Sequence, residues 1–330
     1  YIESNRLGDR NGKGSQGASY YAAPNPPYGA VFTYHLKDKL TTPKEDRKER
    51  EKGDDWTYPS LEELRAEDRA RDPRIVLTVK DDNGQVVRRI DGPRSDGMHR
   101  VAWDLRYPPV SPIDLNPSGP DNPWSWVPRG QLALPGTYTV TLSKEVEGEM
   151  TDLAGPVSFS VEPLGNATFA ATDREEMFEF QRKVGRLHRA VQGALRVAND
   201  AQERIDHCRK AVNETPDADP VLLTRVESIN DTLDEIKVAL RGDPSVSGRM
   251  HPQSPSISSR VSSIVADQWD VTSPPTGTQR EQYEYASTEF TGVLDALRTL
   301  VQQTIPSVEN ELEAAGAPYT PGRFPDWRPE

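Results

Sequence analysis

Pairs of acidic side chains are the first residues in this sequence that could carry out a reaction. Asp104 with Asp114, or Glu62 with Glu63, could serve as the two carboxyl groups of a glycoside hydrolase. Such a pair works only when the two groups converge across a cleft about 5 to 10 Å wide. The chain has 52 acidic residues, and most carboxylates lie at protein surfaces. We therefore see no catalytic constellation, and whether the protein is an enzyme stays open.

The histidines and the single cysteine give no metal-binding or nucleophile pattern. The five histidines are scattered, without a pair at metal-ligand spacing. Cys208 lies on an apolar stripe, which predicts a buried thiol. Adjacent residues of a helix point in different directions, so His207 does not form a pair with this thiol. The segment Asp9 to Gly14 has the Asp and Asn oxygens of a calcium loop but lacks the bidentate Glu. We predict no cofactor and no metal.

Aromatic side chains in irregular segments are the remaining candidates, and they favour binding rather than a reaction. The candidates are three of the four tyrosines in the Gly- and Pro-rich start of the chain, two tryptophans in a long Pro-rich loop, and one tryptophan in the C-terminal tail. Exposed aromatic rings anchor protein contacts or stack on sugars. The predicted interaction residues are Tyr20, Tyr21, Tyr28, Trp124, Trp126 and Trp327.

Composition narrows the classes of partner. The net charge of −12 and the pI near 5.1 argue against nucleic acid, whose phosphates require a basic face. No window approaches about 18 uninterrupted apolar residues, so we predict no membrane span. The chain begins at Tyr1 without an initiator Met or a signal-like apolar run. We expect it to be a piece of a longer protein.

The first half of the chain predicts a β-sandwich. Residues 1–30 read as an irregular docking segment, and residues 31–165 contain short alternating segments separated by turn residues, among them Asn83-Gly84 and Pro135-Gly136. Trp103 shares a face with Val101 and Leu105 and should lie in the core. This pattern is typical of an immunoglobulin-like or fibronectin-like sandwich. A charged insertion near 38–72 interrupts it, with a capping box at Ser60 that opens a short helix.

The second half predicts long helices. Apolar or small residues recur at steps of three and four from Met177 to Val212, then from Leu222 to Leu240 and from Tyr283 to Leu300. The bundle should span 166–322, with a Ser- and Pro-rich connection near 243–277 and a tail at 323–330. Pro306 should kink or shorten the third helix. The predicted fold is α+β and multidomain, an Ig-like sandwich followed by an elongated antiparallel three-helix bundle.

Several segments resemble the C-terminal region of large exported bacterial proteins with BNR-type, sialidase-like or sortilin-like β-propeller repeats, which are often labelled glycosyl hydrolases. The segments that carry the resemblance cover most of the chain and include 23–34, 97–108, 134–140, 239–243 and 313–323. The resemblance implies that a propeller lies upstream of Tyr1. No Asp-box repeat occurs in this chain, so any hydrolase activity implied by the family would belong to that propeller.

Together these observations predict a non-catalytic scaffold and protein-interaction region. Its partners would be the upstream propeller and other envelope proteins, and its location would be the periplasm, the outer-membrane surface or the extracellular space. The alternative is an accessory region of a BNR-type glycoside hydrolase whose loop tryptophans contact glycan.

Overall fold

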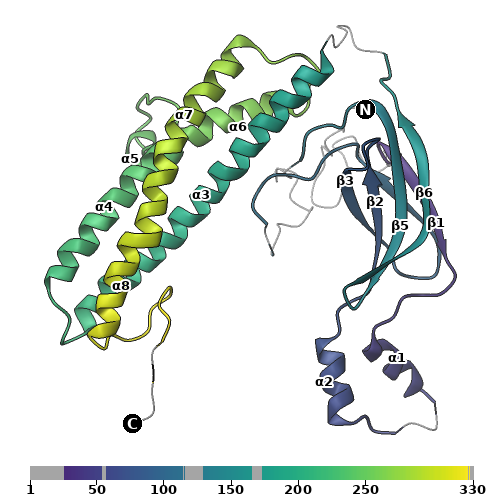
Figure 1. Cartoon of the computed structure of the whole chain (residues 1–330), viewed down its shortest axis with the longest axis horizontal. Helices are drawn as coiled ribbons and strands as arrows, with labels where there is room; N and C mark the ends of the chain where they lie inside the picture. Colours follow the sequence, from purple (N-terminus) through teal and green to yellow (C-terminus); the bar gives the residue numbers. More distant parts are fainter. Residues whose placement is uncertain are drawn as a thin grey trace, which may run out of the picture. The chain divides into compact units, whose positions relative to one another are not determined.

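The computed structural model describes residues 26–53, 57–113, 115, 129–165, 173–325 and 327. The chain divides into two compact units. The first, here called the β unit, comprises residues 1–109 and 116–170, and the second, the helical unit, comprises residues 110–115 and 171–330. The architecture is mixed α+β, with small antiparallel sheets in one unit and long helices in the other (Figure 1).

The β unit contains a two-stranded and a four-stranded sheet. In the smaller sheet, β1 (Ala30–Leu36) pairs with β4 (Gly97–Trp103). The larger sheet has the order β3-β2-β5-β6, and all its pairs are antiparallel. Its strands are β3 (Val86–Gly92), β2 (Arg74–Lys80), β5 (Gly136–Val146) and β6 (Glu149–Val161).

Two hairpin turns set the register of the larger sheet. Between β2 and β3, the Asp81 carboxylate accepts hydrogen bonds from the backbone N–H groups of Asn83 and Gln85 at 3.0 and 2.8 Å. Between β5 and β6, Glu147 and Gly148 both have positive φ, 51° and 82°, as the mirror-image hairpin turns require. The sequence predicted the first of these turns, at Asn83-Gly84.

Side chains from both sheets meet in two apolar clusters. Tyr34 and Leu36 of β1 pack with Ile75 and Leu77 of β2. In the second cluster, Trp103 is fully buried among residues of the other strands, as predicted. The clusters show why alternate residues of β2 and β4 must be apolar.

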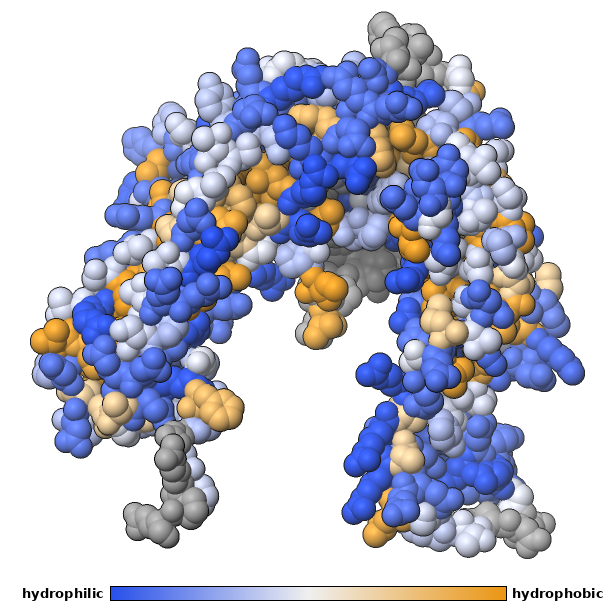
Figure 2. All heavy atoms as spheres, viewed as in Figure 1, coloured by the Kyte–Doolittle hydropathy of each residue, from blue (hydrophilic) through white to orange (hydrophobic). Residues whose placement is uncertain are grey.

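The charged insertion forms two helices, α1 (Pro43–Arg50) and α2 (Leu61–Arg69). Each begins with a capping box, at Thr42 and Glu45 for α1 and at Ser60 and Glu63 for α2. Only the second was predicted. Hydrophilic side chains predominate on this insertion (Figure 2), and neither helix has a buried residue.

The helical unit is organised around α3 (Arg174–Glu214), whose 41 residues correspond to about 60 Å. The other elements are α4 (Val221–Arg241), α5 (Pro244–Ser247), α6 (Ile257–Gln268), α7 (Gly277–Thr299), the π-helical turn η1 (Leu300–Thr304) and α8 (Ile305–Ala314). Lengthwise, α4 and the α7–α8 run lie beside α3, and α6 lies at the end where α3 begins (Figure 1). No helix of the described residues is long and apolar enough to cross a membrane.

Interhelical ion pairs show the directions of the helices. The α3–α4 pair Arg209–Glu227 spans a short connection, so α4 runs antiparallel to α3. Lys183 binds Glu284, and Arg204, further along α3, binds Glu309, further along the α7–α8 run. The third long helix is therefore parallel to α3.

The predicted apolar stripe of α3 is buried from Met177 to Val212. From Phe180 onwards it shares one continuous cluster with α4, α6, α7 and α8. Asp173 caps the helix by accepting from Glu176 N at 2.9 Å. Burial of one face along the whole helix makes α3 a rigid element.

The third long helix changes its winding just before Pro306. Proline lacks an N–H and its ring clashes with the carbonyl four residues earlier, so a regular α-helix cannot continue through it without adjustment. The chain adjusts by the π turn η1, after which α8 carries Pro306 in its first turn. This locates the irregularity predicted at Pro306.

Candidate functional site

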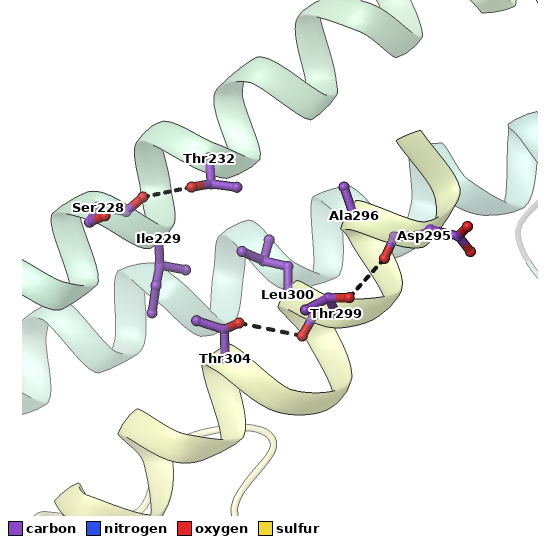
Figure 3. Close-up of a pocket in the computed structure, with 8 residues that line it drawn as sticks. All are labelled: Ser228, Ile229, Thr232, Asp295, Ala296, Thr299, Leu300 and Thr304. Atoms are coloured by element: carbon purple, nitrogen blue, oxygen red, sulfur yellow. Dashed lines mark hydrogen bonds between the residues drawn. The ribbon is translucent and has the colours of Figure 1, made fainter. Parts of the chain in front are cut away.

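One hollow of the helical unit is a groove between α4 and the α7–η1 junction, with a volume of about 460 Å³ (Figure 3). Ile229 and Leu300 form its apolar floor. Ser228, Thr232, Asp295, Ala296, Thr299 and Thr304 line the rest of the groove. Because π turns often lie at functional sites, this groove is the candidate binding site of the helical unit.

The threonine hydroxyls of the groove already donate hydrogen bonds to carbonyl oxygens of the helices. Thr232 donates to the Ser228 carbonyl and Thr299 to the Asp295 carbonyl, each at 3.0 Å, while Thr304 donates to the Thr299 carbonyl at 3.4 Å. Each of these oxygens can then offer only acceptor lone pairs to a ligand. The Asp295 carboxylate also accepts, and it is paired with Arg298 at 2.5 Å. The groove can therefore bind donor groups but contains no arrangement of a nucleophile with a base.

A second hollow, of about 690 Å³, lies between α1 and α2 of the β unit. Arg47 closes its wall by donating to both Glu67 oxygens at 2.7 and 2.9 Å and also to Glu51. The Arg47 guanidinium lowers the pKa of Glu67 by hydrogen bonding. The ion pairs hold the two short helices together, so these charges have a structural role.

Buried charges lie where α3, α8 and the C-terminal segment meet. Arg204 donates to Glu309 at 2.8 and 2.7 Å, and the Glu309 side chain is 4% exposed. Gly322 covers this pair so closely that an added Cβ would lie 2.6 Å from Arg204 Nε. The buried side chain of Arg323 donates to the Ala317 carbonyl at 3.0 Å and lies 3.1 Å from Glu313. These contacts fasten the C-terminal segment to the helices.

Cys208 lies next to that cluster and is buried, as predicted. Burial, and after it the negative charge of Glu309, raises the pKa of the Cys208 thiol to about 11. Its neighbour His207 instead contacts the Glu203 carbonyl through Nδ1 at 2.6 Å. The thiol therefore stays protonated and is not paired with the imidazole.

We expect Cys208 to be unreactive in the folded chain. With a pKa near 11, its thiolate fraction at pH 8 is about 100-fold below that of an ordinary thiol. Because the folded pKa is raised, this group stabilises the fold below the unfolded pKa, and that stability is lost as the pH rises towards 11. Labelling with a disulfide reagent at pH 8 should be slow in buffer and fast in guanidinium chloride. Rapid labelling of the folded chain would contradict the buried thiol.

The predicted interaction residues are only partly covered by the described residues. Tyr28 lies two residues before the start of β1 and is half-exposed, and Trp327 is 81% exposed. The remaining four, Tyr20, Tyr21, Trp124 and Trp126, lie outside the described residues. The groove itself was missed, although Pro306 with Thr299 and Thr304 before it was an available signal.

Glu63 and Asp104, one from each proposed acid pair, both accept hydrogen bonds from residues close to them in the sequence. Glu63 accepts hydrogen bonds from the Ser60 N–H at 2.7 Å and the Ser60 hydroxyl at 2.9 Å, which lower the pKa of its carboxyl. Asp104 accepts from Arg106 N at 3.2 Å, and Asp114 lies outside the described residues. Among the described residues, no three His, Cys, Asp or Glu side chains gather closely enough to hold a metal ion.

Comparisons of the chain with protein-family models, with curated proteins and with solved structures found no match.

Proposed function

We propose that this chain is a non-catalytic scaffold and protein-interaction region that follows a β-propeller in an exported bacterial protein. One observation carries the structural side of the proposal: α3 is buried on one face from Met177 to Val212 and so forms a rigid support about 60 Å long. Such a support separates surfaces rather than enclosing a substrate. The resemblance described above supplies the identity of the partner, the upstream propeller, and the exported location.

The β unit would be the Ig-like or fibronectin-like part of this region. Two antiparallel sheets that share apolar clusters, with the buried indole of Trp103 between them, support this assignment. For the alternative function, glycan contact, the exposed ring of Trp327 is the supporting observation among the described residues.

Binding in trans tests the proposal. The propeller that precedes Tyr1 in the parent protein, produced separately, should bind this chain with a Kd below about 10 μM. Replacing Tyr20 and Tyr21 together by Ala should weaken binding about tenfold or more, because buried tyrosines anchor interfaces. Tyr58→Ala is the matched control, since Tyr58 is a 75% exposed tyrosine in the charged insertion. No measurable binding of the propeller by the unaltered chain would refute the proposal.

A further inference from the structure

Opposite its buried stripe, α3 carries one exposed line of mostly charged side chains. Like the buried residues, the members of this line follow one another at steps of three and four. All are exposed except Gly193, which is partly exposed. The line consists of Glu179, Arg182, Arg186, Arg189, Gly193, Arg196, Asp200, Glu203, His207 and Lys210.

The charges on this line are divided between its two halves. Four arginines precede Gly193 or follow it directly, and the next two members, Asp200 and Glu203, are acidic. Arg182 pairs with Glu179 at 3.1 Å. Within the described residues, Arg186, Arg189 and the two acids form no side-chain ion pair. Their charges are available to a partner in a chain whose overall charge is −12.

We propose that this face of α3 binds a second copy of this chain, with the two α3 helices antiparallel about a twofold axis. With Gly193 opposite Arg196 of the second copy, three layers of the line bring opposite charges together. In two antiparallel helices related by a twofold axis, each residue at the start of the line faces a residue at the end of the line of the other copy. The opposed residues are Glu179 with Lys210, Arg182 with His207, Arg186 with Glu203, and Arg189 with Asp200, and the twofold axis makes each pair occur twice.

The two neighbouring registers bring like charges together. A shift of one heptad in one direction puts Arg186 opposite Lys210 of the second copy, and a shift in the other direction puts Arg186 opposite Arg196. Like charges that face each other disfavour a complex strongly. The register with Gly193 opposite Arg196 is therefore favoured over its two neighbours.

Gly193 supports a close approach at the centre of this arrangement. A glycine inside a helix is less stable than alanine. A Cβ added at Gly193 would meet no atom within 4 Å in the described structure, which means that packing within the chain does not require glycine there. The backbone of a second helix crossing at this point would.

The association should depend strongly on salt. Exposed ion pairs are individually weak and are screened by dissolved ions. Several such ion pairs formed together favour the dimer at low ionic strength. At high ionic strength they are screened, and the dimer dissociates. Sedimentation velocity over a wide concentration range, at about 20 mM and about 500 mM salt, should therefore show a reversible dimer only in the first condition.

Charge exchange tests the register. Arg189→Glu or Asp200→Arg alone should raise the dimer dissociation constant about 10- to 100-fold, because each puts two like-charged layers together. The combined variant Arg189→Glu with Asp200→Arg should return to within about threefold of the unaltered chain. Arg241→Glu is the matched control on the exposed end of α4. Far-UV circular dichroism checks that each variant is folded.

The glycine provides an independent readout. Gly193→Gln and Gly292→Gln should both raise the Tm of the helical unit, since both replace a glycine inside a helix with open space around it. Only Gly193→Gln should also weaken the dimer. A chain that stays monomeric at low salt, or a dimer unaffected by Arg189→Glu and Asp200→Arg, would overturn the proposal.

Discussion

Trp103→Ala is expected to destabilise the β unit by about 3 to 5 kcal/mol, as large-to-small changes of buried aromatics do. The indole is 0% exposed and contacts two further aromatic rings edge-on, with centroid distances of 5.2 Å to Tyr138 and 6.2 Å to Phe159. Its Nε1–H donates to the Arg106 carbonyl at 2.9 Å. The substitution therefore leaves a cavity and also removes a hydrogen bond.

Hydrogen exchange of the β2 and β5 amides is the suitable measurement, because it reports on the β unit separately from the helical unit. Trp327→Ala, at an 81% exposed tryptophan, is the control and should change stability by less than about 0.5 kcal/mol. If Trp103→Ala lowers the free energy of opening by less than about 1 kcal/mol, the packing of the two sheets around this side chain is wrong.

The elements that could be predicted from the sequence are those whose signals are local. The stripe of α3 repeats over many turns, so it predicted the helix and its buried face from the sequence alone. The turn residues Asn83 and Gly84 likewise predicted the β2–β3 hairpin, because glycine readily adopts the positive φ that Gly84 has, 76°.

Elements that depend on distant partners were not predictable in this way. The first half of β6 is exposed on both faces, so no alternation of apolar residues marks it, and it is a strand because β5 pairs with it. The buried polar residues Gln181 and His188 of α3 lie beside the apolar stripe and look like surface residues in the sequence. The groove of Figure 3 needs α4 against the π turn, a contact between residues about 70 positions apart.

Glu309 illustrates the same limit and leads to the second large effect. In the sequence it is one of 52 acidic residues, yet it is buried and held by Arg204, which lies 105 positions earlier. Removing one partner of a buried ion pair leaves an uncompensated charge. We expect Glu309→Leu to destabilise the helical unit by about 3 kcal/mol, the lower end of the usual range because Arg204 retains some contact with water.

The double variant Arg204→Met with Glu309→Leu separates burial of an unpaired charge from a general disturbance of the core. Replacing both partners by apolar groups of similar size is often close to neutral, so the double variant should recover most of the stability lost in Glu309→Leu. Glu311→Ala is the control on the same helix, because its ion pair with Arg225 is about half exposed and should contribute less than about 1 kcal/mol. Urea unfolding followed by far-UV circular dichroism measures all three. A double variant as unstable as Glu309→Leu would show that the leucine, and not the unpaired guanidinium of Arg204, causes the loss.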